Sequence, residues 1–130
     1  MQKYGFNGYY NFHYDWDGGS REGNRMTTFL VYLNDNYTGG GTNFPRLEQP
    51  VDQRWCGVIL CTGDEDYEEY HGVTFKPVMG SAIYWENFYP NGTPHKGTRH
   101  AGLPVRSGEK LGLNIWSWDA SWRPQGGNED

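Results

Sequence analysis

The segment Met26-Thr27-Thr28-Phe29-Leu30-Val31-Tyr32-Leu33 is the strongest strand candidate in the sequence. Read as an extended chain, it carries large apolar side chains on both of its faces. Aromatic and β-branched residues fill it, and these residue types favour strands. We therefore expect a central strand that is buried on both faces.

Shorter segments of the same kind lie on both sides of this strand. Turn-forming residues separate them, since the chain contains 19 glycines and 7 prolines. Further strands are predicted over residues 9–16, 55–61, 73–78, 81–85 and 111–118. Short strands at regular spacing, with no convincing helix between them, predict an all-β sandwich or jelly roll with little helix. The acidic run over residues 64–69 is expected to form a solvated surface loop or one helical turn.

The length of 130 residues predicts a single domain. We expect this domain over residues 1–123 and a mobile tail over residues 124–130. Phe, Trp and Tyr together number 22, against 16 for Val, Ile and Leu, so aromatic rings are expected to dominate the core.

Charge and hydropathy exclude several classes of function. The net charge of -5 provides no basic surface for nucleic acid, so no nucleic-acid partner is expected. Mean hydropathy is -0.87 and no apolar stretch reaches the length of a membrane span, so no membrane partner is expected. The chain shows no apolar core of a signal peptide, and the compartment stays open, with the secretory pathway among the alternatives.

The two cysteines, Cys56 and Cys61, allow two interpretations. They could form one bridge between neighbouring strands, or they could be two small buried residues. The sequence does not decide between them.

His13-Tyr14-Asp15 is the first pattern that points to chemistry. Residues two apart on a strand face the same side, so the imidazole of His13 and the carboxylate of Asp15 can reach one ion. The motif alone is short, and a surface histidine beside an acid is the competing interpretation.

The last predicted strand places Lys110, Gly112, Asn114 and Trp116 on one face and leucine and isoleucine on the other. The leucine side is expected to pack between the sheets or under a supporting layer. The Lys110 side then lines the interior, where an ammonium requires an anionic partner. A socket for a ligand carboxylate is one interpretation, and a strand-end lysine with its head in water is the other.

His100, ten residues before Lys110, completes a set of two histidines and one carboxylate. Such a set forms the facial triad of non-haem Fe(II) oxygenases, which leaves three metal positions open for other ligands. His71 and His95 lie in polar segments, and we expect both to be exposed.

The order of these motifs resembles the catalytic domain of prolyl 4-hydroxylases from Tyr4 to Trp116. The matching patterns are Tyr4-Gly5-x3-Tyr9-Tyr10-x2-His13-x-Asp15, Arg25-x2-Thr28-x-Leu30-x-Tyr32-Leu33, Gly39-Gly40-Gly41-Thr42-x-Phe44-Pro45, Pro77-x2-Gly80-x-Ala82-x2-Trp85, His100-Ala101-Gly102-x-Pro104-Val105-x2-Gly108-x-Lys110 and Asn114-x-Trp116. Trp85-Glu86-Asn87 and Leu113-Asn114-Ile115-Trp116 are similar to fungal or related eukaryotic members. The family usually has helices and extra strands before the tyrosine that matches Tyr4, and we expect their absence here to affect stability and activity.

This resemblance implies an Fe(II)- and 2-oxoglutarate-dependent dioxygenase on a double-stranded β-helix, with O2 as co-reactant and ascorbate as reductant. Iron would be held at the positions matching His13, Asp15 and His100. The far carboxylate of 2-oxoglutarate would meet Lys110, with Tyr4 and Thr42 assisting. Residues matching Tyr10, Arg25 and Trp116 lie near the substrate in the family.

For the substrate residues, aromatic core packing competes with substrate binding at Tyr10 and Trp116, and an ordinary salt bridge competes at Arg25. The function expected from the resemblance is hydroxylation of prolyl residues to 4-hydroxyproline in a peptide or protein. The net charge favours neutral or basic peptides over acidic ones. The alternatives are the same fold acting on a free amino acid or small metabolite, and a non-catalytic jelly-roll module.

Overall fold

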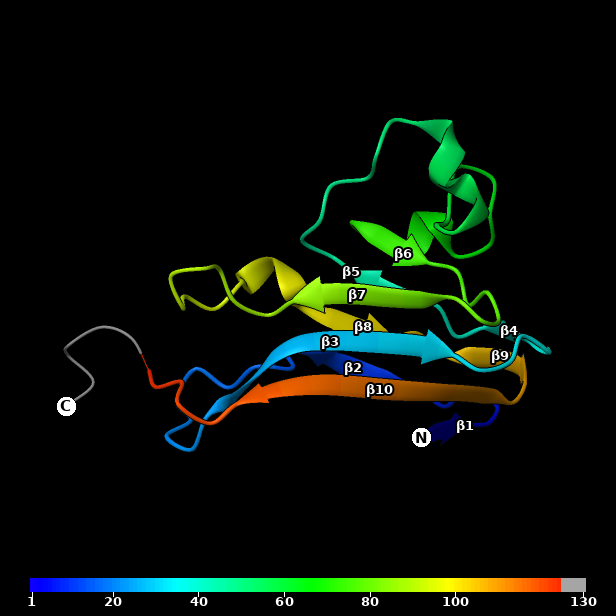
Figure 1. Ribbon diagram of the computed structural model, residues 1–130. Coiled ribbons are helices and arrows are strands. Elements are labelled where there is room, and N and C mark those ends of the chain that lie inside the picture. The colour runs from blue at the N-terminus through cyan, green and yellow to red at the C-terminus, as the bar shows by residue number, and fades with distance from the viewer. Residues whose placement is uncertain (125–130) are drawn as a thin grey trace.

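The structure is a computed structural model that describes residues 1–124, and within them it has two facing antiparallel sheets and no α-helix (Figure 1). The larger sheet has the strand order β1 (Gln2–Tyr4), β10 (Lys110–Asp119), β3 (Asn24–Tyr32) and β7 (Ala82–Glu86). The smaller sheet has the order β2 (Tyr10–His13), β8 (His100–Gly102), β5 (Thr42–Phe44) and β6 (Val73–Phe75). β4 (Tyr37–Gly39) and β9 (Val105–Gly108) pair separately. The predicted all-β class with little helix is confirmed.

Aromatic rings from both sheets meet in the core, as the composition predicts. Tyr32 of β3, Phe44 of β5, and Ile83 and Trp85 of β7 form the buried cluster. The ring centroids of Phe44 and Trp85 lie 5.1 Å apart in an edge-on arrangement, which joins the two sheets.

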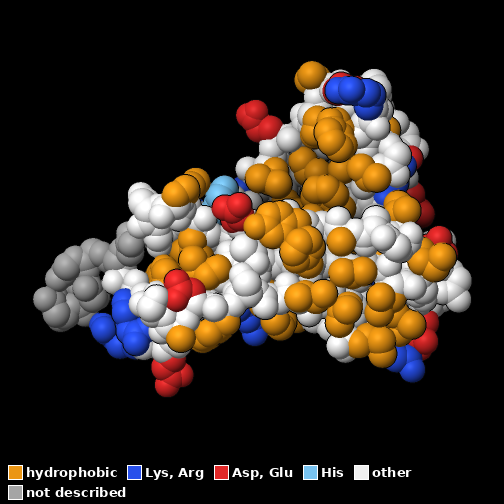
Figure 2. All heavy atoms as spheres, viewed as in Figure 1, with side chains coloured by type: hydrophobic (Ala, Val, Ile, Leu, Met, Phe, Trp, Pro, Cys, Tyr) orange, Lys and Arg blue, Asp and Glu red, His pale blue; other side chains and the backbone are white. Residues whose placement is uncertain are grey.

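The outer face of the larger sheet corrects the expectation for the central strand. β3 lies between β10 and β7 and is buried on its inner face. On its outer face Phe29 is 42% exposed, and its ring lies beside that of Tyr84 with centroids 4.7 Å apart. Figure 2 shows hydrophobic side chains gathered over this face. No part of residues 1–124 forms a layer over it, so the prediction of burial on both faces is wrong, and Ile115 on the leucine side of β10 is likewise exposed.

The segment predicted as a strand over residues 55–61 is also a correction. It contains the end of a 3-10 helix, η1 (Gln53–Gly57), whose first turn is capped by the Asp52 side chain accepting from the Arg54 backbone N–H. Only Ile59 forms a bridge, to Phe75. Two further 3-10 turns, η2 (Tyr67–Glu69) and η3 (Lys96–Thr98), lie in the loops.

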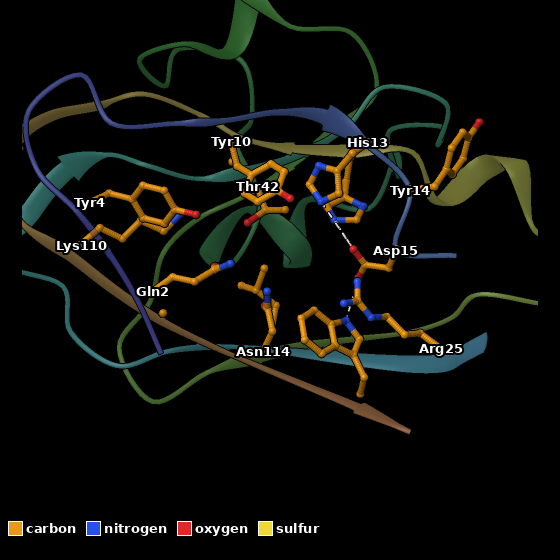
Figure 3. A pocket seen from close by; sticks show the side chains of 15 residues that line it. Gln2, Tyr4, Tyr10, His13, Tyr14, Asp15, Arg25, Thr42, Lys110 and Asn114 are labelled. Atoms are coloured by element: carbon orange, nitrogen blue, oxygen red, sulfur yellow. Dashed lines mark hydrogen bonds and ion pairs between the residues drawn. The ribbon is translucent and has the colours of Figure 1, made fainter. Parts of the chain in front are cut away.

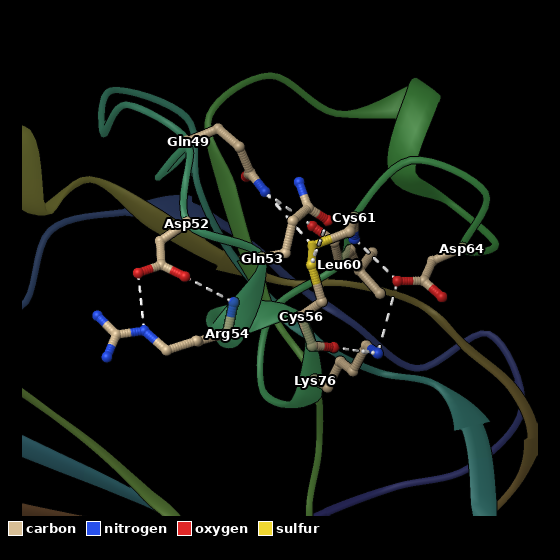
Figure 4. Close-up of a disulfide and its surroundings, with 9 residues drawn as sticks. All are labelled: Gln49, Asp52, Gln53, Arg54, Cys56, Leu60, Cys61, Asp64 and Lys76. Carbon is tan, nitrogen blue, oxygen red and sulfur yellow. Dashed lines mark hydrogen bonds and ion pairs between the residues drawn. A yellow bond between two sulfur atoms is a disulfide. The ribbon is translucent and has the colours of Figure 1, made fainter.

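A disulfide between Cys56 and Cys61 explains why this segment cannot extend (Figure 4). The two Cα atoms lie 5.6 Å apart, whereas five extended residues span roughly 17 Å. The open choice for the cysteines is therefore settled in favour of a bridge, although it closes a loop and does not join neighbouring strands. Lys76 supports the loop by donating to the Cys56 carbonyl at 2.6 Å and pairing with Asp64 at 3.5 Å.

Replacing both Cys56 and Cys61 with serine is expected to lower the free energy of unfolding by about 2 kcal/mol, because the closed loop is short and restricts the unfolded chain only modestly. Urea denaturation of the two proteins measures the difference. The unaltered protein unfolded in dithiothreitol should match the serine variant. Equal midpoints for the oxidised protein and the variant would contradict the expectation.

Of the tail predicted over residues 124–130, only Pro124 lies within the described residues. Within residues 1–124, no helix has the length and apolar character needed to span a membrane.

Candidate active site

A cavity of about 190 Å³ opens between the two sheets (Figure 3). Both sheets contribute to its walls, with β2 and β8 on one side and β10 and β3 on the other. All nine residues singled out from the sequence line it: Tyr4, Tyr10, His13, Asp15, Arg25, Thr42, His100, Lys110 and Trp116. The fold therefore gathers side chains from positions 4 to 116 into one space.

His13, Asp15 and His100 converge at one end of this cavity. The pairing of β2 with β8 sets His13 directly opposite His100, and Asp15 follows just after the end of β2. Asp15 Oδ1 lies 3.4 Å from His13 Nε2 and 3.5 Å from His100 Nε2. One ligand atom from each residue lies within 4.8 Å of the others, which is compact enough for a single metal ion.

Backbone carbonyls orient both imidazoles. His13 Nδ1 lies 2.7 Å from the Asn11 carbonyl, and His100 Nδ1 lies 2.8 Å from the Thr98 carbonyl. Because a carbonyl oxygen only accepts, each Nδ1 carries the proton and donates it. Each Nε2, the ring nitrogen that faces Asp15 Oδ1, is therefore the imidazole atom left for a metal ion.

Protonation at this cluster also suits metal binding. Burial on its own would raise the pKa of Asp15, but the hydrogen bond from His13, the charge of His100 and donors from Thr28 and Trp116 lower that pKa to about 2. Burial lowers the pKa of His100, against the opposing effect of Asp15. Near neutral pH the carboxylate is ionised and the His100 imidazole is neutral, so two nitrogens and one oxygen form the donor set of an Fe(II) facial triad.

Lys110 lies at the opposite end of the cavity and lacks a carboxylate partner among residues 1–124. Its side chain is buried, with 5% of the residue exposed, and burial lowers its pKa to about 8. Its Nζ lies 5.4 Å from the Tyr4 ring centroid and 5.7 Å from that of Tyr32. A buried ammonium near two aromatic rings, with no carboxylate partner among the described residues, fits the carboxylate of a ligand.

Thr42 and Gly40 shape the space around this lysine. Thr42 is fully buried, and its hydroxyl shares a short hydrogen bond with the Tyr32 hydroxyl. Gly40 has a φ of 73°, and a Cβ at this position would lie 3.2 Å from Lys110 Cδ and 2.9 Å from the Tyr37 ring. Glycine is therefore required here both for backbone conformation and for space.

Tyr10, Arg25 and Trp116 lie around the mouth of the cavity. The Tyr10 ring lies 4.1 Å from the His13 ring and Tyr10 is 48% exposed. The Arg25 guanidinium lies 3.8 Å above the Trp116 ring, and no carboxylate within residues 1–124 forms an ion pair with it. Exposure of Tyr10 and Trp116 disfavours pure core packing, and the absent ion pair disfavours the salt-bridge interpretation of Arg25, while their contact with substrate stays a prediction.

The other two described histidines stand apart from the triad. His71 is exposed, as expected. His95 is half-buried, which corrects the expectation of exposure, because its Nδ1 accepts from the Gly97 backbone N–H and its ring stacks on Tyr89 at 4.5 Å.

The comparisons with known proteins agree with this geometry. The model of the 2OG-Fe(II) oxygenase superfamily matches residues 1–118. The chain belongs to this superfamily. Membership confirms the resemblance and, together with the two facing sheets, the predicted double-stranded β-helix.

Several relatives of this 2OG-Fe(II) oxygenase are prolyl 4-hydroxylases by name. Probable prolyl 4-hydroxylase 4 of Arabidopsis thaliana is 34% identical over 116 residues, which cover 85% of this chain and 37% of the relative. Prolyl 4-hydroxylase subunit alpha-1 of Gallus gallus is 30% identical over 124 residues, covering 89% and 19%. The chain thus spans well under half the length of either curated relative.

A solved structure has the same fold. It is the viral collagen prolyl hydroxylase from Paramecium Bursaria Chlorella virus-1 in complex with 2OG, which is 30% identical with a TM-score of 0.60. The match covers 88% of this chain and 54% of the viral protein. Membership in the 2OG-Fe(II) oxygenases implies Fe(II) and 2-oxoglutarate, and the triad and the buried lysine provide chemically suitable sites for both.

Sequence reasoning missed three residues that support this site. Tyr32 reaches the Thr42 hydroxyl, Thr28 donates to Asp15, and Asn87 bonds to Thr28. Thr28 and Tyr32 lie on the inner face of β3 together with Leu30, so strict alternation along the central strand was the available signal. Asn87 stood in the Trp85-Glu86-Asn87 pattern of the family resemblance, but nothing in the sequence gave it a role.

Proposed function

We propose that this chain is an Fe(II)- and 2-oxoglutarate-dependent dioxygenase that hydroxylates prolyl residues in a peptide or protein. The main support is one cavity with a His-Asp-His cluster at one end and a buried lysine at the other. Within residues 1–124 no carboxylate pairs with this lysine. Named prolyl 4-hydroxylases among the relatives support the choice of proline.

In this proposal His13, Asp15 and His100 hold the iron, and Lys110 holds the far carboxylate of 2-oxoglutarate. When bound, Fe(II) and 2-oxoglutarate supply the oxidation that inserts one atom of O2 into a C–H bond, with succinate and carbon dioxide as products. Asp15 contributes a carboxylate that stays ionised, because its pKa is about 2. Thr42 and Tyr4 line the space between iron and lysine and orient the cosubstrate.

Selectivity for proline would come from the mouth of the cavity. Tyr10 and Trp116 offer two aromatic faces beside the metal ligands, and such faces pack well on a flat pyrrolidine ring. Arg25 adds donors suited to a peptide carbonyl. A proline within a polyproline II segment enters such a site with little ordering cost.

Mass spectrometry of proline-rich peptides tests the proposal. Incubation with Fe(II), 2-oxoglutarate and ascorbate is expected to add one oxygen atom to a proline, as 4-hydroxyproline, and to produce succinate in equal amount. Omission of 2-oxoglutarate should prevent both. Oxygen incorporation into free proline or another metabolite, with every proline peptide unchanged, would overturn the peptide assignment, and no succinate under any condition would overturn the enzymatic one.

Tyr10→Ala is expected to raise the KM for the peptide about tenfold, since one aromatic contact contributes about 0.5–1.5 kcal/mol beyond its buried area. The Kd for 2-oxoglutarate should stay unchanged. Phe6→Ala is the matched control, because Phe6 is an exposed aromatic residue outside the cavity lining. Trp116→Ala is less informative, since the Trp116 indole also donates to Asp15. A Tyr10→Ala protein with unaltered peptide KM would remove Tyr10 from the substrate site.

A further inference from the structure

Asn87 is a fully buried polar residue that the proposed reaction does not use directly. It follows β7 and is 0% exposed. Its side-chain oxygen accepts from Trp85 Nε1 at 2.9 Å, and its Nδ2 donates to Thr28 Oγ1 and to the Arg25 carbonyl, both at 3.1 Å. Its backbone N–H donates to the Met26 carbonyl at 2.9 Å. Both polar atoms of the Asn87 side chain are therefore hydrogen-bonded.

Trp85, Asn87, Thr28 and Asp15 form a series of hydrogen bonds, and the groups at its two ends fix the direction of each bond. An indole N–H only donates, so the Asn87 oxygen must face Trp85 and the Asn87 amide nitrogen must face Thr28. The Thr28 hydroxyl then accepts from Asn87 and has a single proton left to donate. That proton goes to Asp15 Oδ2 at 2.8 Å, and an ionised carboxylate only accepts. Each hydrogen bond in the series is therefore donated in the same direction, from Trp85 to Asn87, from Asn87 to Thr28 and from Thr28 to Asp15.

This series of hydrogen bonds determines which oxygen of Asp15 faces the metal position. Oδ2 receives both the Thr28 hydroxyl and, at 3.2 Å, the Trp116 indole N–H. Oδ1 is left facing the Nε2 atoms of His13 and His100 (Figure 3). With Oδ2 occupied by two donors, the carboxylate offers one oxygen to a metal ion.

The same asparagine also acts on a second ligand. The Trp85 indole, fixed by its bond to Asn87, packs edge-on against the His100 ring with centroids 4.8 Å apart. In the larger sheet Thr28 lies directly opposite both Trp85 and Trp116, so the three inward side chains form one row. The Asn87 amide therefore holds the neighbours of two proposed metal ligands. These neighbours are Thr28 beside Asp15 and Trp85 beside His100.

We propose that Asn87 is a positioning residue that presets the metal site, through Thr28 for Asp15 and through Trp85 for His100. It touches neither metal nor substrate. Groups that orient metal ligands contribute about 10- to 100-fold to metal affinity. Loss of Asn87 therefore leaves the three ligands in place and lets them rotate.

Metal titration in the absence of 2-oxoglutarate and peptide tests this proposal. Mn(II) is the probe for affinity, and the visible spectrum of bound Co(II) reports the geometry of its ligands. Asn87→Ala and Thr28→Val are each expected to weaken Mn(II) binding by about 10- to 100-fold and to alter the Co(II) spectrum. Thr28→Val keeps the shape and strand preference of the residue, so it carries the test even where Asn87→Ala does not fold.

Two control variants separate positioning from simple stability. Thr28→Ser keeps the hydroxyl and should restore Mn(II) affinity. Asn43→Ala removes a comparably buried asparagine of β5, whose amide donates to the His71 carbonyl and to Thr74 and forms no hydrogen bond with His13, Asp15 or His100. Asn43→Ala is expected to destabilise the fold while leaving Mn(II) affinity within about twofold, as for independent sites.

Wild-type Mn(II) affinity in Thr28→Val would overturn the proposal. So would an equal loss in Asn43→Ala and Asn87→Ala at temperatures where both are folded. The inference rests on the proposed metal site but not on proline as substrate. A protein that binds Mn(II) with this pattern and hydroxylates no peptide would disprove the proposed function and leave the role of Asn87 intact.

Discussion

His100→Ala is expected to abolish turnover and to weaken Mn(II) binding well beyond 100-fold. Groups that only orient ligands contribute about 10- to 100-fold, so loss of a ligand nitrogen costs more. His100 Nε2 lies 3.5 Å from Asp15 Oδ1 in a buried setting where water would replace it poorly. Succinate release and Mn(II) titration measure the two effects.

Two other histidines serve as controls for this prediction. His71→Ala should retain activity and stability, because the His71 side chain is exposed. His95→Ala should retain turnover while losing some stability, since the ring caps η3 and stacks on Tyr89. Loss of turnover in His95→Ala, with His100→Ala active, would refute the assignment of the third ligand.

The alternation along the last strand is the part of the fold that the sequence predicted best. Lys110 and Gly112 are buried and line the cavity together with Trp116, as a two-residue period requires. The two-residue alternation does not indicate whether the opposite face of the sheet is covered, because burial depends on which other segments pack there. Phe29 and Ile115 show this limit, since apolar residues occupy a face that residues 1–124 leave open.

The region around the cysteines shows a different limit. Apolar residues over 55–61 resemble a strand in composition, but the bond between Cys56 and Cys61 forces the chain to turn back within five residues. Spacing alone left the bridge undecided, because two cysteines at this separation are compatible with either interpretation.

The site itself was accessible to sequence reasoning where residues carry distinctive chemistry. Histidine, aspartate and lysine in a familiar order predicted one cavity, and the fold brings them together. Thr28 and Asn87 were not found, because a neutral hydroxyl or amide has meaning only through the direction of its hydrogen bonds. Those directions follow from the contact between β3 and β7, which no local pattern specifies.

Lys110→Met is expected to raise the Kd for 2-oxoglutarate at least about tenfold, since a charge-assisted hydrogen bond is worth about 1.5–3 kcal/mol. Mn(II) should still bind, because Lys110 lies at the opposite end of the cavity from His13 and Asp15 (Figure 3). The ligand-free variant should also be more stable than the unaltered protein by about 1–4 kcal/mol, because a buried ammonium with no carboxylate partner in residues 1–124 is replaced by an apolar side chain of similar length. Unchanged 2-oxoglutarate affinity would refute the role of Lys110 in binding the 2-oxoglutarate carboxylate.

The pH dependence supplies an independent test of the same lysine. In the ligand-free fold its pKa is about 8, below the ordinary value of 10.5, because the side chain is buried. The ammonium that binds a carboxylate predominates well below pH 8 and is lost as pH rises through 8, so 2-oxoglutarate affinity should be constant at low pH and decline through that range. Between about pH 8 and 10.5 the unfolded chain holds a proton that the fold has released, so this lysine makes the fold more stable as pH rises through that window. Lys110→Met should lack both the decline in affinity and this rise in stability, and an identical pH profile in the two proteins would show that the buried ammonium is not the group that titrates.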